Sequence, residues 1–192
     1  MSFIHLCTTS AYSFKYGTTQ PRDLVERAAE FEMPALALTD RDSFAGTIRF
    51  AKSCLDYGIA PIIGINLPIA IGDLSGALPR VTVLAHGDGG WRSLVRLLTG
   101  LQMNSLDRTA VLTPELLEKF SEYTSNLHLL HGPESPVSQA LATHRFDAAL
   151  DIFNQTRDLF ADHAIECVSH LVGGSGPRST AHAARSLIFA RD

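Results

Sequence analysis

Short apolar runs alternate with amphipathic stretches along the 192 residues of the chain. Runs of about four to eight apolar residues are typical of buried strands, whereas apolar residues spaced three and four apart indicate helices. The runs predict six strands, at residues 3–7, 35–38, 61–65, 80–85, 126–130 and 164–168. The amphipathic stretches predict helices between these strands. About six alternations of strand and helix favour an α/β fold, either a barrel or a doubly wound sheet.

Helix ends are marked by proline, threonine and glycine at positions where each residue type fits. Pro21 and Pro114 suit the first position of a helix, and Thr113 suits the cap before it. Gly58 suits the left-handed residue that ends the preceding helix. That helix is predicted to bury an apolar face made of Phe44, Ile48, Ala51 and Leu55. Trp91 falls in the apolar stripe of the next helix and is predicted to lie in the core.

Composition and charge exclude several classes of protein. A hydrophobic fraction of 45% and a charged fraction of 19% are typical of a globular protein. With 16 basic against 20 acidic residues, the chain shows no basic stripe for gripping DNA, so any DNA contact is expected through a larger assembly. Residues 59–71, the longest apolar stretch, are interrupted by prolines and too short to span a membrane. Three cysteines without CxxC spacing argue against a disulfide framework or a structural zinc site, which favours a cytoplasmic location.

Three segments carry a resemblance to a known family. Residues 3–13 read FIHLCTTSAYS, which is similar to the opening F-x-H-L-H-V-H-S-x-Y-S of bacterial DNA polymerase III alpha subunits. Residues 33–40, MPALALTD, and residues 58–64, GIAPIIG, resemble that family's M-P-A-L-A-L-T-D-H and G-I-K-P-I-I-G-x-E. The resemblance implies that residues 1–192 are the PHP (polymerase and histidinol phosphatase) domain, an N-terminal fragment of a larger replicative or error-prone polymerase subunit.

The resemblance also implies a fold and an activity. PHP domains are distorted, TIM-like barrels of seven strands, and active members hold a metal cluster on the C-terminal face that hydrolyses phosphoesters. In some polymerases this site proofreads DNA in the 3′ to 5′ direction. Residues 186–191 still read as the middle of a helix, so the barrel is expected to be incomplete at the C-terminus.

The metal ligands of the family fall on residues of other types in this chain. These degenerate metal-site positions are Cys7, Thr9, Tyr16, Arg41, Asn66 and Arg80. A further ligand falls near Gly132, and the last pair lies beyond Asp192. Arg41 and Arg80 bring permanent positive charge and no lone pair, so metal, cofactor and catalytic residues are all expected to be absent. The two arginines are expected to pair with Asp40, Asp42 or another carboxylate, or to bind a phosphate or other anion.

Three functions remain open at this stage. The first is an inactive module in DNA replication or translesion synthesis, within a DNA-directed DNA polymerase (a nucleotidyltransferase). It would stabilise the remainder of the polymerase subunit and dock a proofreading exonuclease or other replisome protein. The second is a phosphoesterase or 3′–5′ exonuclease that holds Mn or Zn at a relocated site made of Asp40, His86, His131 and His170. The third is a free-standing anion-binding regulator of the same fold.

Overall fold

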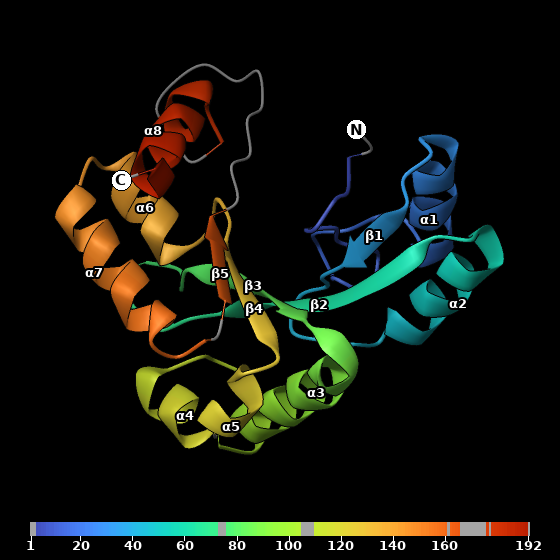
Figure 1. Cartoon of the computed structure of the whole chain (residues 1–192), viewed down its shortest axis with the longest axis horizontal. Coiled ribbons are helices and arrows are strands. Elements are labelled where there is room, and N and C mark those ends of the chain that lie inside the picture. The colour runs from blue at the N-terminus through green and yellow to red at the C-terminus, as the bar shows by residue number, and fades with distance from the viewer. Residues whose placement is uncertain are drawn as a thin grey trace.

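The structure is a computed structural model that describes residues 3–72, 76–104, 110–160, 162–165, 176 and 178–191, apart from the side chains of residues 88 and 162–165. Five strands form one sheet in the order β1-β2-β3-β4-β5. Their bounds are β1 Ala35–Leu38, β2 Ala60–Pro68, β3 Arg80–Ala85, β4 Leu127–His131 and β5 Asp162–Ile165. The predicted α/β class is therefore confirmed (Figure 1).

The strands do not all run in the same direction. β1 is parallel to β2 and β4 is parallel to β5, whereas β3 is antiparallel to both of its neighbours. Among the described residues the sheet is open, with β1 and β5 at its edges, so these residues do not form the expected seven-stranded barrel. The antiparallel β3 brings the start of this strand beside the ends of β2 and β4.

The predicted strand at residues 3–7 is not formed as a regular strand. This segment nevertheless runs along the free edge of β1. The backbone N–H of Ala37 donates to the carbonyl of His5 at 2.9 Å, and that of Thr39 donates to the carbonyl of Thr8 at 2.8 Å. The segment therefore continues the hydrogen bonding of the sheet, although its own geometry is irregular.

Eight helices are seen among the described residues, and each predicted helix has a counterpart. Their bounds are α1 Pro21–Glu30, α2 Thr47–Tyr57, α3 Gly87–Asn104, α4 Pro114–Lys119, α5 Ser121–Thr124, α6 Pro136–Ala142, α7 Phe146–Arg157 and α8 Thr180–Arg191. Thr113 caps α4 by accepting from the N–H of Leu116, and Gly58 ends α2 at φ 70°. In Figure 1, α1 and α2 pack together beside β1, and α6, α7 and α8 gather at the β5 end of the sheet.

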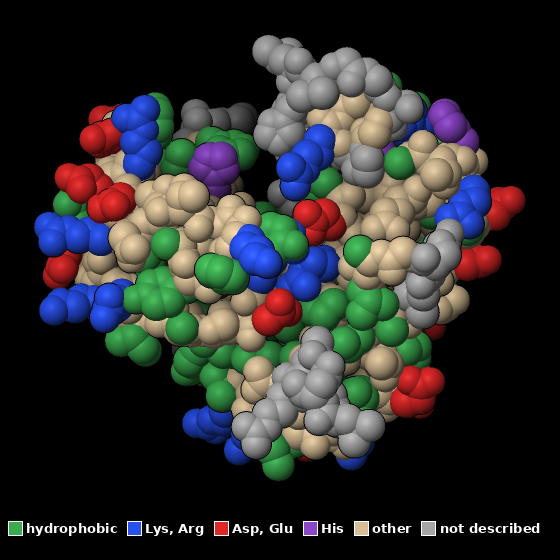
Figure 2. Space-filling model, turned by 180° about the vertical axis from the view of Figure 1, so that it is seen from behind, with side chains coloured by type: hydrophobic (Ala, Val, Ile, Leu, Met, Phe, Trp, Pro, Cys, Tyr) green, Lys and Arg blue, Asp and Glu red, His purple; other side chains and the backbone are tan. Residues whose placement is uncertain are grey.

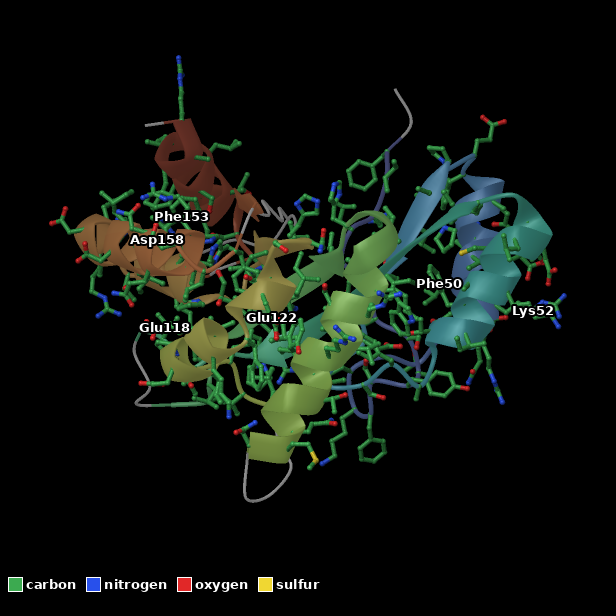
Figure 3. All side chains as sticks on the ribbon, turned by 60° about the horizontal axis from the view of Figure 1, so that its bottom comes forward. Phe50, Lys52, Glu118, Glu122, Phe153 and Asp158 are labelled. Carbon is green, nitrogen blue, oxygen red and sulfur yellow. The ribbon has the colours of Figure 1, made fainter. Side chains whose placement is uncertain are left out.

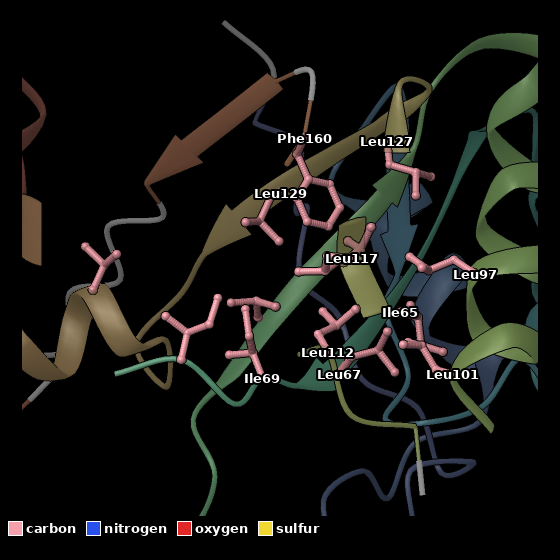
Figure 4. Close-up of a cluster of buried hydrophobic side chains, with 14 of the residues drawn as sticks. Ile65, Leu67, Ile69, Leu97, Leu101, Leu112, Leu117, Leu127, Leu129 and Phe160 are labelled. Atoms are coloured by element: carbon pink, nitrogen blue, oxygen red, sulfur yellow. The ribbon is translucent and has the colours of Figure 1, made fainter. Parts of the chain in front are cut away.

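A large apolar cluster holds the middle of the sheet to α3. Ile65 and Leu67 of β2 belong to this cluster with Leu97 and Leu101 of α3, and all four side chains are fully buried (Figure 4). Burying a side chain of this size contributes about 1.5–3 kcal/mol. A smaller cluster joins α1, α2 and β1 around Phe50. These clusters fix the strands whose ends carry the charged residues described below.

The predicted apolar face of α2 is wrong. Ile48 and Leu55 are 74% and 76% exposed, whereas Phe50 and Cys54 are fully buried. Figure 3 shows Phe50 pointing from α2 into the protein. The helix has apolar residues around much of its circumference, and its contact with α1 decides which of them are covered.

Trp91 was predicted to lie in the core, but it is 40% exposed. Its ring packs edge-on against the ring of Phe44.

Basic and acidic side chains are interspersed on the surface. On the face shown in Figure 2, blue basic groups lie next to red acidic groups near the centre and at the margins.

In the described part of the chain, no helix is both long enough and apolar enough to cross a membrane.

Candidate functional site

One cavity lies where β1, β2 and β4 end and β3 begins. Its position follows from the antiparallel β3, whose first residue, Arg80, is paired with Pro68 near the end of β2. The cavity has a volume of about 280 Å³. Its lining is Cys7, Thr9, Thr39, Arg41, Asn66, Arg80, Thr82, Gly132, Pro133, Glu134 and Arg178.

The structure brings the degenerate metal-site positions together. Five of the six line this cavity, namely Cys7, Thr9, Arg41, Asn66 and Arg80. The sixth, Tyr16, lies at its border, where the guanidinium carbon of Arg41 is 3.4 Å from the centre of the tyrosine ring. Gly132, near which another family ligand was expected, also contributes to the wall.

Arg80 donates three hydrogen bonds to two residues. Its Nη2 donates to Oδ1 of Asp42 at 2.8 Å and to the backbone carbonyl of Asn66 at 2.8 Å, and its Nε donates to Oδ1 of Asn66 at 2.6 Å. The Asn66 amide in turn donates to the hydroxyl of Thr82 at 3.3 Å. Because the Arg80 side chain is only 14% exposed, these bonds fix the direction of its guanidinium group.

Arg41 is held by a carboxylate that arrives from the loop after β4. Its Nη2 lies 2.6 Å from Oε2 of Glu134, and Oε1 of the same carboxylate lies 3.6 Å from Nη2 of Arg178. Glu134 is 40% exposed, so each ion pair contributes only about 1 kcal/mol or less. The pairs therefore set the arrangement of charges more than the stability of the domain.

Sequence reasoning missed Glu134 and Arg178. The only signal for Glu134 was its place shortly after the predicted fifth strand, since residues that follow strands gather at one edge of a sheet. Arg178 follows a glycine-rich segment and carried no signal that separates it from other surface arginines. Both residues are recognisable only because the fold brings them to Arg41.

Asp40 has a different role from the one expected for an arginine partner. Its carboxylate accepts from the backbone N–H and the hydroxyl of Ser10 and from the hydroxyl of Ser13, each at 2.7 Å. Ser13 also accepts from the backbone N–H of Arg41 at 2.9 Å. Asp40 is 2% exposed, so its oxygen atoms are committed to holding the loop that contains both serines.

The residues of the alternative metal site are not brought together. His86 follows the antiparallel β3 and so lies at the opposite end of the sheet from Asp40, with its ring 4.5 Å from that of His128. His131 is fully buried, and its Nε2 is 3.3 Å from the hydroxyl of Thr156. His170 lies outside the described residues. Within the described ranges, no three His, Cys, Asp or Glu side chains are grouped so that they could hold a metal ion.

The donor set of the cavity does not fit the metal cluster that the resemblance implies. Guanidinium groups have no lone pair, and they place positive charge where a cation would have to bind. The thiol of Cys7 is 3.7 Å from the hydroxyl of Thr82, and Glu134, the one carboxylate among the lining residues that the structure describes, is paired with arginine. The cavity presents mainly hydrogen-bond donors, which suits negatively charged oxygen better than a cation.

Comparison with known proteins gives one family. The model of the PHP domain matches residues 5–170. An error-prone DNA polymerase of Corynebacterium efficiens is 37% identical over 132 residues, which are 69% of this chain and 12% of that protein. DNA polymerase III subunit alpha of Buchnera aphidicola is 34% identical over 140 residues, 72% of this chain and 12% of that protein. The chain thus spans about an eighth of the length of these relatives.

Among solved structures, a protein described as a metal-dependent phosphoesterase from Bifidobacterium adolescentis matches with a TM-score of 0.49 and 12% identity. That match covers 98% of this chain and 82% of the other.

Proposed function

Because the chain belongs to the PHP domain family, we propose that it is a non-catalytic PHP domain of a DNA polymerase III alpha-type subunit. The polymerase assignment is supported by the two relatives described above, which are both much longer polymerase proteins. In this proposal the domain acts in DNA replication or translesion synthesis, in the cytoplasm, as part of a DNA-directed DNA polymerase. Nucleotide addition and DNA contact belong to the remainder of that subunit.

The observation that carries the proposal is the pair of arginines in the cavity. The family resemblance implies metal ligands at the positions of Arg41 and Arg80, and each of these arginines is ion-paired with a carboxylate. A divalent cation about 4 Å from a guanidinium group would be repelled by roughly 8 kcal/mol at an effective dielectric constant of about 20. Glu134 and Asp42 offset part of this repulsion, but neither guanidinium group has a lone pair with which to hold a metal ion, so we expect no metal-dependent hydrolysis at this cavity.

The proposed role is to stabilise the polymerase and to present a docking surface. Among the described residues, β5 forms an edge of the sheet, and in this proposal further strands of the polymerase subunit pair there to complete a seven-stranded barrel. The proposed partner is a proofreading exonuclease or another replisome protein. A domain that has lost its own hydrolytic site would gain proofreading from such a partner.

Metal analysis of the purified chain tests this proposal. The chain is incubated with Mn²⁺ or Zn²⁺, dialysed and analysed by mass spectrometry of the metals, and in parallel it is assayed on nitrophenyl phosphate and a 3′-mismatched primer. We expect far less than one metal ion per chain and no hydrolysis above the blank. Stoichiometric metal, with hydrolysis that EDTA abolishes, would instead establish a phosphoesterase or 3′–5′ exonuclease with an altered metal site.

A further inference from the structure

Among the described residues, the cavity wall carries three guanidinium groups and one carboxylate. The cations are Arg41, Arg80 and Arg178, and the carboxylate in the lining is Glu134. We propose that this cavity binds a small tetrahedral oxyanion of the phosphate class, with the arginines as its donors. This inference rests on the proposed function, because a cavity that held a metal cluster would bind an anion through the metal ions instead.

Arg41 and Arg80, whose side chains are mostly buried, have N–H groups that donate to no described residue. Among the described residues, Nε and Nη1 of Arg41 and Nη1 of Arg80 have no hydrogen-bond acceptor, although the two side chains are only 16% and 14% exposed. N–H groups in such partly buried positions are normally satisfied by protein, water or ligand. The ring of Tyr16 holds the guanidinium group of Arg41, and the bonds that Arg80 donates to Asn66 hold that of Arg80, so little side-chain entropy remains to be lost on binding.

The neutral residues of the wall and the size of the cavity point to the same class of ligand. Thr82 accepts from the Asn66 amide and from the thiol of Cys7, which leaves its own hydroxyl proton available to an acceptor in the cavity. A volume of about 280 Å³ equals roughly nine water molecules at ~30 Å³ each. This space accommodates one hydrated phosphate group and is too small to enclose a nucleic acid strand.

Glu134 limits the affinity for an anion in the native protein. Its two oxygens face Arg41 at 2.6 Å and Arg178 at 3.6 Å, so the carboxylate competes with a ligand for the same donors. Replacing this carboxylate by the neutral amide of glutamine keeps its shape and removes one negative charge. The structure therefore predicts that variants of Glu134 and Arg178 change phosphate affinity in opposite directions, which a purely structural role would not produce.

Calorimetric titration with inorganic phosphate tests the inference, in EDTA and at an ionic strength held constant with chloride. We expect saturable binding of one phosphate per chain, weakened about tenfold in Arg178→Gln and strengthened severalfold in Glu134→Gln. The matched control is Arg157→Gln, because Arg157 is 57% exposed and lies 3.6 Å from Asp158, much as Arg178 is 62% exposed and lies 3.6 Å from Glu134. This control should bind phosphate like the native chain.

Four outcomes would overturn the inference, and they separate it from the proposed function. An absence of saturable binding, or equal weakening in Arg178→Gln and Arg157→Gln, removes the oxyanion site and leaves the non-catalytic proposal standing. Weaker binding in Glu134→Gln shows that Glu134 does not compete with the anion, which removes the arrangement of donors proposed here. Phosphate binding that appears only after Mn²⁺ is added overturns both proposals, because the metal would then provide the site.

Discussion

Replacing Asp40 should destabilise the domain strongly and without any dependence on metal. Asp40 is 2% exposed and accepts three hydrogen bonds of 2.7 Å from Ser10 and Ser13. The relocated metal site, which the sequence left open as an alternative, would instead make this carboxylate a metal ligand. The two roles predict different behaviour for Asp40→Ala and Asp40→Asn, which makes this residue the most informative position to perturb.

The size of the effect follows from these three bonds. A hydrogen bond to a charged group contributes about 1.5–3 kcal/mol, and a buried donor left without a partner costs a similar amount. Asp40→Ala removes all three acceptors, but water can enter the vacated space, so we expect a loss of about 3–5 kcal/mol. Asp40→Asn keeps one accepting oxygen and the side-chain shape, and should cost about 1–2 kcal/mol.

Urea unfolding, followed by circular dichroism in EDTA and again in Mn²⁺, measures this loss as a change in the free energy of unfolding. The control is Asp158→Ala, because Asp158 is 75% exposed and its removal should change stability by less than about 0.5 kcal/mol. A loss below about 1 kcal/mol for Asp40→Ala, or one that appears only in Mn²⁺, would refute the structural role of Asp40.

Three further predictions concern other parts of the fold. Burial raises the pKa of the Cys54 thiol to about 11, so iodoacetamide at pH 8 should label Cys54 only after unfolding, as read by mass spectrometry. Burial, and then a nearby arginine, lower the pKa of His182 below 6.5; the free energy of unfolding should therefore fall as pH drops below 6.5, and less so in His182→Gln. In Gly17→Ala the new methyl group would overlap the carbonyl of Ser10 and cost about 1–3 kcal/mol in urea unfolding, whereas Gly76→Ala, which meets open space, should be neutral.

Much of the local structure was predictable from residue pattern. The strands at 35–38 and 80–85 have the predicted bounds, and, as expected, Thr113 caps the start of α4 and Gly58 ends α2. These features depend on residues close in sequence, such as a side-chain oxygen three positions before a helical N–H. The apolar face of α2 was not predictable in the same way. Ile48 and Phe50 are both apolar, and only contacts with α1 and β1 decide which of them is buried.

In the candidate site, too, some features were predictable from the sequence and others depend on the tertiary structure. The sequence by itself was enough to predict that Arg41, Asn66 and Arg80 stand in place of metal ligands, because the surrounding segments resemble the family motifs. Only the tertiary structure decided their partners. Strand direction leaves no trace in the apolar pattern, yet the antiparallel β3 brings Arg80 to the cavity and carries His86 to the other end of the sheet. Glu134 reaches Arg41 across 93 positions of sequence, a contact that the folding of the whole sheet produces and local spacing does not encode.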